Sequence, residues 1–348
     1  MFDYIFITHL PSFYKLNLYN ELSKKLKIRV IFVGNKSSIR TGDFTAGDLK
    51  FDYDFLSNQE FEKRNKIRCL LKLFQILTAT KYKNIVVGGW ELLEFWLAVL
   101  VSNKNQNSLA LESSIEESVH SGIKGFIKKM FLKRVTTVFA SGVSQKELLD
   151  ELGYKNKVYI TKGVGIMNKP NITENINNFD HHFRGNCLYV GRLSPEKNLS
   201  TLIKVFNDLP QFKLTIVGSG PLERELKEIA KENIKFLSHV INNDIRRIYM
   251  ENDIVLLPSK SETWSLVVEE ALYYGLPVII SNKVGCGPEL VKGKENGIIF
   301  DVASNEDLRD SILKMAEDYN HYQDKVKDFN INKKDQEQVD CYVRALIK

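Results

Sequence analysis

The chain has 348 residues, with 49 Lys and Arg against 43 Asp and Glu, six His, four Cys and eight Pro. At about 100–200 residues per domain, this length predicts two domains that each bury a core of their own. A hydrophobic content of 43% and a charged content of 26% exclude a disordered or fibrous chain. The four cysteines lie far apart without a CxxC motif or a Cys/His cluster. This spacing argues against a disulfide scaffold or a zinc module and fits a reducing cytosol.

The net charge of +6 is unevenly distributed along the chain. Residues 1–165 carry 25 basic and 16 acidic side chains (+9), whereas residues 166–348 carry 24 basic and 27 acidic ones (−3). A basic half joined to a mildly acidic half predicts that one domain faces a polyanionic surface. Charge alone leaves open whether that surface is a membrane, a nucleic acid or an anionic substrate.

Short apolar runs in the first half of the chain predict strands. No basic leader precedes the first run, so we expect no export signal, and the most apolar stretch, Leu92–Val101, is too short to span a membrane. Residues 35–59 are polar and irregular, and predict a long loop or a pair of edge strands. The expected strands are Tyr4–Thr8, Arg29–Val33, Asn84–Val87, Ser108–Leu111, Thr137–Ala140 and Lys157–Ile160.

The second half alternates strands and amphipathic helices more regularly. This alternation predicts a parallel, doubly wound sheet with helices on both faces, in which ligands bind outside the carboxyl ends of the strands. The helices are expected at Leu199–Leu209 and Leu222–Glu232, and the tail from Asp318 to Lys348 is helical in pattern. The expected strands are Cys187–Val190, Leu214–Val217, Ile234–Phe236, Ile254–Leu257, Val278–Ile280 and Ile298–Phe300.

The predicted fold class is α/β, with two Rossmann-like doubly wound domains facing each other across a cleft. An Asn-rich stretch with Pro170 lacks periodicity and predicts the linker between them. We assign residues 1–165 to the first domain, 166–184 to the linker, 185–325 to the second domain, and 326–348 to a C-terminal helix that could cross back to the first domain. Several activities share such an architecture, so the choice among them depends on the residues at the strand ends.

A first motif runs from Val190 to Asn198 and reads VGRLSPEKN. A strand ends at Gly191, and a helix is expected to begin near Asn198, with Arg192 and Lys197 on the loop between them. Two cations beside the free backbone N–H groups of a helix N-terminus suit a diphosphate. On spacing alone, a capped and solvated loop explains the motif equally well.

A second motif runs from Pro258 to Val278 and contains Glu262 after a strand and Glu270 eight positions later, inside the next helix. At about 1.5 Å per helical residue, the two carboxylates could contact different parts of one extended ligand, such as a sugar hydroxyl and a ribose diol. The alternatives are an unpaired helix-surface acid at Glu270 and a helix-dipole carboxylate at Glu262. The neighbouring Glu269 leaves a register ambiguity that Ala271 and Gly275 resolve toward Glu270.

Over residues 186–302 the chain resembles the group 1 (family 4) glycosyltransferases, retaining enzymes of GT-B fold that use nucleotide-activated sugars. Glu262 and Glu270 match the E-x7-E signature of this family, and GRL followed by Lys197 matches its G-R-L…K motif. Two glycine-containing turns, at 214–221 and 281–291, also agree in order and spacing. Four motifs in register make the resemblance specific.

The resemblance implies a role for each matching residue. Arg192 and Lys197 would hold and stabilise the donor diphosphate beside Gly191, Glu262 would contact the transferred sugar, and Glu270 would bind the ribose. The further residues implied in donor binding are Thr263, Trp264, Ser265, Leu266, His239 and Val240. The family often reads E-G-F-G-L where this chain reads ETWSL from residue 262, so the sugar pocket is reshaped and the donor sugar is left unnamed.

The N-terminal half resembles the family loosely, as expected if it binds a variable acceptor. The Gly-rich loop of many relatives is replaced by residues 8–14, and Lys15 could substitute for it by charge. His9, Trp90 and Glu112 end expected strands and are the acceptor-side candidates, although a structural role for His9 is equally compatible.

Two segments interleave cations with large apolar residues, at 124–134 and at 63–77. An interfacial helix on an anionic membrane has this composition, and so has an ordinary helix that packs its apolar face on the domain. We expect both at once, as packed helices with a basic outer face. Nucleic-acid binding is not expected, because no recognised motif accompanies the charge.

The sequence thus predicts a metal-independent, retaining, hexosyltransferase-type enzyme (EC 2.4) that uses a UDP- or GDP-sugar and needs no cofactor. Asp52-Tyr-Asp54 resembles a D-x-D metal motif, but it lies in an irregular region. The expected acceptor is a lipid-linked glycan of bacterial surface polysaccharide, in a cytoplasmic protein or one peripheral on the inner face of the cell membrane. The rivals are a nucleotide-sugar epimerase, a nicotinamide-dependent oxidoreductase, which lacks its G-x-G-x-x-G motif, and a non-catalytic scaffold.

Overall fold

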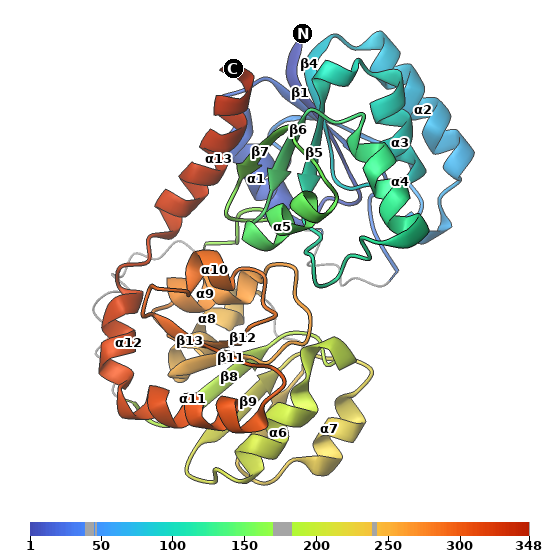
Figure 1. The fold of residues 1–348 in the computed structure, drawn as a ribbon. Helices are drawn as coiled ribbons and strands as arrows, with labels where there is room; N and C mark the ends of the chain where they lie inside the picture. The colour runs from blue at the N-terminus through green and yellow to red at the C-terminus, as the bar shows by residue number, and fades with distance from the viewer. Residues whose placement is uncertain (39–44, 46, 170–182, 239–241, 348) are drawn as a thin grey trace. The chain divides into compact units, whose positions relative to one another are not determined.

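The computed structural model describes residues 1–38, 45, 47–169, 183–238 and 242–347 of the chain. Two compact units result from its contacts, and each is described by itself (Figure 1). Unit 1 comprises Met1–Asn168 together with Asn332–Lys348, and unit 2 comprises Lys169–Ile331. Most of the predicted linker, 170–182, lies outside the described residues.

Unit 1 contains a seven-stranded parallel sheet in the order β3-β2-β1-β4-β5-β6-β7. The strand order reverses direction between β1 and β4, which makes their carboxyl ends the switch point where ligands bind in such sheets. The strands are β1 (Phe2–Thr8), β2 (Ile28–Phe32), β3 (Asp52–Phe55), β4 (Tyr82–Val87), β5 (Asn107–Leu111), β6 (Thr137–Ala140) and β7 (Lys157–Ile160).

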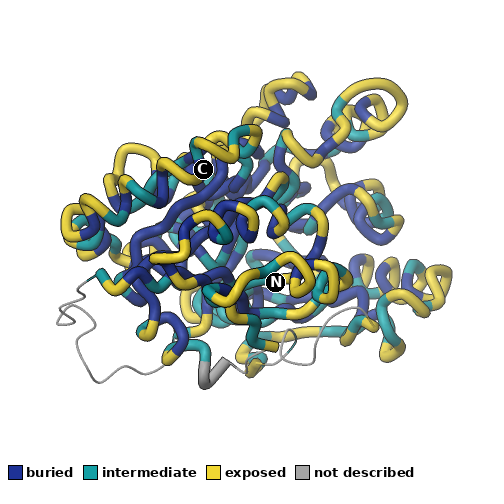
Figure 2. Tube along the Cα trace, turned by 90° about the horizontal axis from the view of Figure 1, so that it is seen from below, coloured by how far each residue is buried: buried dark blue, intermediate teal, exposed yellow. Residues whose placement is uncertain are grey.

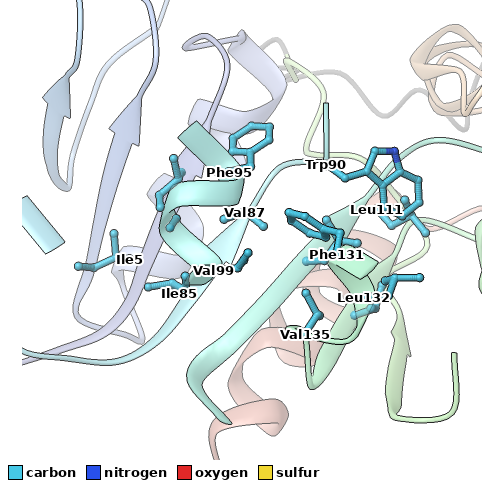
Figure 3. Packing of buried hydrophobic residues seen from close by; sticks show 14 of the residues in the cluster. Ile5, Ile85, Val87, Trp90, Phe95, Val99, Leu111, Phe131, Leu132 and Val135 are labelled. Atoms are coloured by element: carbon cyan, nitrogen blue, oxygen red, sulfur yellow. The ribbon is translucent and has the colours of Figure 1, made fainter. Parts of the chain in front are cut away.

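Helices cover both faces of this sheet, because alternate residues of each strand point to opposite sides. Ile5 and Ile7 of β1 belong to a core shared with α2 to α5, whereas Tyr4 and Phe6 belong to a second core shared with α1 and α13 (Figure 3 shows part of the first core). The helices are α1 (Phe13–Ser23), α2 (Lys66–Ala79), α3 (Leu93–Val101), α4 (Gly122–Leu132), α5 (Val143–Glu151) and α13 (Ile331–Ile347).

The last helix, α13, is joined to the sheet of unit 1 by aromatic packing. The rings of Tyr342 and Phe139 are stacked with centroids 4.2 Å apart, and the Tyr4 hydroxyl donates to the Tyr342 carbonyl at 2.9 Å. The end of the chain therefore packs in the same core as its first strand.

Unit 2 contains a six-stranded parallel sheet in the order β10-β9-β8-β11-β12-β13, with buried strands between helices (Figures 1 and 2). The strands are β8 (Asn186–Val190), β9 (Lys213–Val217), β10 (Ile234–Leu237), β11 (Ile254–Leu257), β12 (Val278–Ser281) and β13 (Gly297–Phe300). The helices are α6 (Leu199–Asn207), α7 (Glu223–Ile229), α8 (Asn242–Glu251), α9 (Leu266–Tyr273), α10 (Gly287–Leu290), α11 (Asn305–Glu317) and α12 (Tyr319–Val326).

Two local expectations are refined by the structure. The irregular region 35–59 contributes one short edge strand, β3, and its Asp54 accepts from Arg29 Nε of β2 at 2.7 Å, so the D-x-D sequence lies on a paired strand. The expectation that α4 packs its apolar face on the domain is wrong, although exposed lysines do lie on its outer side. The outer side chains Ile123 and Phe126 are apolar and are 80% and 63% exposed. Cations lie beside them.

Candidate functional site

The loops that follow β8 and β9 are tied together at the carboxyl edge of the unit 2 sheet. Gly191 N donates to the Val217 carbonyl, and Leu193 N donates to the Ser219 carbonyl, both at 3.0 Å. Gly218 has a φ of +139°, and a Cβ added there would lie 1.9 Å from the Gly191 carbonyl oxygen. Only glycine allows this approach, which fixes the position of the GRL segment.

An ion pair joins the motif at 190–198 to the motif at 258–278. Lys197 ends the short 3-10 helix Pro195–Lys197 after β8, and its Nζ pairs with Glu262 Oε2 in the loop after β11. Their side chains are only 13% and 20% exposed. Strands β8 and β11 are neighbours in the sheet, so their carboxyl-terminal loops meet although 65 residues separate the two side chains.

Arg192 extends from the same loop and is 64% exposed. Its guanidinium contacts Glu196 at 3.2 Å, and Glu196 also accepts from the Ser194 hydroxyl at 2.6 Å. Burial alone would raise the pKa of Glu196, but the Ser194 hydrogen bond and the Arg192 charge lower it below its ordinary value. An anion arriving at this loop would therefore meet one exposed guanidinium and one nearly buried ammonium, each already opposite a carboxylate.

The loop that carries Glu262 is supported by the Gly-rich turn after β12. Glu262 N donates to the Lys283 carbonyl at 3.2 Å, and Gly285 N donates to the Glu262 carbonyl at 2.8 Å. A Cβ at Gly285 would lie 2.1 Å from the Thr263 carbonyl oxygen. The glycine thus lets the two loops run in contact, and the contact orients the Glu262 backbone.

Trp264 and Ser265 have specific structural surroundings. The Trp264 side chain is 2% exposed and donates through Nε1 to Glu269 Oε1 at 2.7 Å, so its ring supports the loop from inside unit 2. Ser265 precedes α9 with a φ of +145°, a conformation that glycine adopts freely and other residues rarely do. Leu266 begins α9 and, like Thr263, is partly buried.

Glu270 is partly buried on α9 and accepts a hydrogen bond from the Tyr249 hydroxyl of α8 at 2.7 Å. Burial raises the pKa of Glu270 to about 7, the Tyr249 hydrogen bond lowers it, and the neighbouring charge of Glu269 raises it. Tyr249 itself is stacked on Tyr274, with ring centroids 4.9 Å apart. No spacing pattern in the sequence connects Tyr249 with Glu270, so this partner could not be predicted from the sequence.

Two predicted donor-binding residues, His239 and Val240, lie outside the described residues. In unit 1, the three acceptor-side candidates follow β1, β4 and β5, which are neighbours in the sheet. The structure therefore brings His9, Trp90 and Glu112 to the same sheet edge.

Each acceptor-side candidate has a partner there. His9 Nε2 lies 2.5 Å from Glu91 Oε1, and the Trp90 backbone N–H donates to Glu91 Oε2 at 2.9 Å. Burial alone would raise the pKa of Glu91, but the His9 hydrogen bond lowers it below its ordinary value. The Trp90 side chain is 8% exposed, with Lys128 Nζ 5.3 Å from its ring centroid.

Glu112 Oε1 lies 2.8 Å from Lys15 Nζ, which also donates to the Thr8 hydroxyl at 3.2 Å. Burial would lower the pKa of Lys15, but the Glu112 charge outweighs it and holds the pKa above its ordinary value. Because the Lys15 ammonium is buried and engaged, the expectation that it replaces the missing Gly-rich loop by charge finds no support in its contacts. No pattern in the sequence predicts the pairing of Lys15 with Glu112.

Comparison with known families decides what this edge of unit 2 resembles. A family model described as "Glycosyl transferases group 1" matches residues 184–335. Residues 184–335 are therefore similar to the group 1 glycosyltransferases. The O-antigen biosynthesis glycosyltransferase WbnH of Escherichia coli is 31% identical over 202 residues, which cover 57% of this chain and 56% of that protein.

Solved structures show the fold of the whole chain. Sucrose-phosphate synthase from Thermosynechococcus elongatus superposes with a TM-score of 0.72 at 16% identity, covering 99% of each chain. HepE of Anabaena, in complex with UDP-glucose, superposes with a TM-score of 0.69 at 16% identity, covering 99% of this chain and 100% of its own. The predicted GT-B fold class is confirmed.

The chain spans half or less of the length of the first curated relatives that it matches: 50%, 25% and 36%. Within the described ranges, no group of three His, Cys, Asp or Glu side chains is arranged to hold a metal ion. None of the helices described is long and apolar enough to cross a membrane.

Proposed function

We propose that the chain is a retaining, hexosyltransferase-type glycosyltransferase of family 4 that moves a sugar from a nucleoside diphosphate to an acceptor hydroxyl. The observation that carries the proposal is the cluster at the carboxyl edge of the unit 2 sheet, where Lys197, Glu262 and Arg192 surround loops built from glycines. The match of residues 184–335 to the group 1 glycosyltransferase family model supports the assignment.

In the proposed reaction, Arg192 and Lys197 bind the diphosphate and balance the charge that builds up as it leaves. Glu262 accepts a hydrogen bond from the transferred sugar, and Glu270 accepts from the ribose diol. The bond between the anomeric carbon and the phosphate oxygen breaks while the acceptor oxygen bonds to that carbon on the same face. The acceptor proton passes to the departing phosphate oxygen, so no protein nucleophile is required.

The two cations supply countercharge at the diphosphate, and we therefore propose that turnover does not require a metal ion or another cofactor. The donor is a UDP- or GDP-sugar, and HepE bound to UDP-glucose supports the first of these through its shared fold. The similarity to WbnH supports an acceptor that is a lipid-linked glycan of bacterial surface polysaccharide. We place the protein in the cytoplasm, peripheral on the inner face of the cell membrane.

A thermal-shift screen of UDP- and GDP-sugars would identify the donor, and release of nucleoside diphosphate would measure turnover. We expect Lys197→Ala and Glu262→Gln to lower turnover about 100- to 1000-fold, the usual effect of losing one transition-state contact. The matched control is Lys260→Ala, because Lys260 is an exposed lysine two residues from Glu262. Near-normal turnover in Lys197→Ala would contradict the assignment.

Two further measurements separate the finer parts of the proposal. NMR of the product should show the anomeric configuration of the donor, and an inverted product would end the retaining mechanism. Turnover should persist in the presence of a strong chelator if the side chains of Arg192 and Lys197 supply enough positive charge at the diphosphate without a metal ion. Conversion of the donor sugar without any acceptor would instead indicate the epimerase alternative.

A further inference from the structure

Most of the large apolar side chains that the described residues expose belong to unit 1 and lie between residues 67 and 130. Except for Val119, which precedes α4, they come from α2, α3 and α4, the helix layer on one face of the unit 1 sheet (Figure 1). Contiguous exposed apolar surface of this kind marks an interaction site. We call the outward side of these three helices the α2–α4 face.

Helix α4 has its apolar stripe on the side away from the core. Ile123, Phe126, Ile127 and Met130 are 80%, 63%, 46% and 42% exposed, and their i, i+3, i+4, i+7 spacing puts them on one side of the helix. The same helix buries Gly125, Phe131 and Leu132 on its other side. A surface helix normally turns its apolar stripe inward, so the outward stripe of α4 indicates a surface that another molecule covers.

Helix α2 repeats the arrangement. Ile67, Leu71 and Phe74 are 71%, 60% and 47% exposed at i, i+4, i+7 positions, while Leu73 and Leu77 are buried. The buried sides of α2, α3 and α4 all enter the same core, so their exposed stripes point to the same side of unit 1 (Figure 3 shows α3 and α4 side chains in that core). The stripes form one surface.

Cations border the apolar stripe of α4. At about 100° per residue, exposed Lys124 lies on one flank of the stripe, and exposed Lys129 and Lys133 lie on the other. Lys128 is engaged elsewhere, because it donates to the Val119 carbonyl at 2.6 Å and lies over Trp90. The sequence contains no Asp or Glu between residues 63 and 90 or between 118 and 146.

We infer that the α2–α4 face docks on an anionic lipid bilayer. The apolar side chains of α4 and α2 enter the boundary of the acyl chains, and Lys124, Lys129 and Lys133 stay among the headgroup phosphates. A second copy of the chain is a poorer occupant. Two such faces would bring cations against cations, with no acid on α2 or α4 to neutralise them.

The inference deepens the proposed function, because it would hold the domain proposed to bind a lipid-linked acceptor at the surface that carries this acceptor. Its geometry is nevertheless independent of the donor site, since every residue of the α2–α4 face belongs to unit 1. Donor binding and lipid binding can therefore fail separately.

The test is flotation of the full chain with vesicles of phosphatidylcholine alone and of phosphatidylcholine mixed with phosphatidylglycerol. We expect binding to the mixed vesicles that weakens as salt rises. Lys129→Gln/Lys133→Gln should weaken it about 25-fold, since each cation near an anionic leaflet contributes roughly fivefold. The matched control, Lys292→Gln/Lys294→Gln, removes two exposed lysines from unit 2 and should bind as the unchanged chain does.

Phe126→Ser/Ile127→Ser should lose at least tenfold in vesicle affinity, while Ile229→Ser, an exposed apolar residue of unit 2, should lose none. Phe126→Trp should show blue-shifted emission that brominated lipids quench. Failure of the unchanged chain to bind anionic vesicles at low salt would overturn the inference, as would full binding by the Ser double variant. So would a dimer that this variant converts to monomer, because the face would then hold a second copy.

Thermal shifts with the nucleotide sugar separate the two proposals. A Ser double variant that keeps the circular dichroism spectrum and thermal unfolding of the unchanged chain but does not bind the vesicles has kept its fold, and the result supports the inference. If the unchanged chain binds anionic vesicles and no nucleotide sugar, the proposed function fails and the docking face stands.

Discussion

Glu270 offers a direct test of how the unit 2 site is built, because its carboxylate is held where ionisation is unfavourable. Burial raises its pKa from the ordinary 4.5 to about 7, although the Tyr249 hydroxyl donates to it. Replacing Glu270 by Gln removes the charge and keeps an oxygen that Tyr249 can still donate to. The substitution therefore isolates the free energy of ionisation.

The sign follows from proton binding. Between pH 4.5 and about 7 the unfolded chain has lost the proton of Glu270 while the folded chain still holds it, so stability falls as pH rises. A shift of this size is worth about 3 kcal/mol once both states are ionised, and solvent screening of the partly exposed carboxylate makes this an upper limit. Glu270→Gln should therefore match the unchanged chain near pH 4.5 and exceed its stability above pH 7.

The assay is urea denaturation at several pH values across this range, monitored by the fluorescence of Trp264. A Trp90→Phe/Trp96→Phe background leaves Trp264, in unit 2, as the reporter. A stability difference that does not change with pH would refute the reasoning. The reasoning would also be refuted if the stability of the unchanged chain rose relative to that of Glu270→Gln as pH increases, because a carboxylate stabilised by a cation behaves in that way.

Three further substitutions test how the loops and the unit 1 core are built. Ser265→Gly should raise the thermal stability of unit 2 by about 1 kcal/mol, since its φ of +145° is strained for serine, whereas Ser265→Ala should give no gain. Gly218→Ala should lower stability in urea by about 3 kcal/mol, because its Cβ would lie 1.9 Å from the Gly191 carbonyl oxygen; a neutral effect would contradict the close approach. Arg64 and Glu94 form a pair only 6% and 0% exposed, so Arg64→Met alone should cost about 3–5 kcal/mol in urea, and Arg64→Met/Glu94→Leu should recover most of it. No recovery in the double variant would mean that the loss comes from packing.

The strands could be predicted from the sequence because their residues are apolar and β-branched. Thr137–Ala140 and Ile254–Leu257 have the predicted ends. Strand β3 was harder to predict, since two aspartates in four residues give it little intrinsic preference for a strand. Its Asp54 forms an ion pair with Arg29 of the neighbouring strand β2. Such a partner becomes visible only when the sheet order is known.

The orientation of α4 could not be predicted from its periodicity. A helical repeat of apolar residues identifies a stripe but does not say which side of the helix the domain covers. In α4 the covered side is formed by Gly125, Phe131 and Leu132, which are fewer than the residues of the exposed stripe. Counting apolar residues therefore selects the wrong side, and the contacts with the core reveal the right one.

The candidate site shows the same limit at the level of single side chains. The resemblance to the glycosyltransferase family placed Lys197 and Glu262 in one site, but their ion pair follows from the adjacency of β8 and β11. The pairing changes what a substitution means, because removing either side chain leaves a nearly buried charge without its partner. Loss of turnover in Lys197→Ala is therefore informative only beside its denaturation curve. If stability falls but recovers in Lys197→Ala/Glu262→Gln while turnover does not, the two effects of Lys197 are separated.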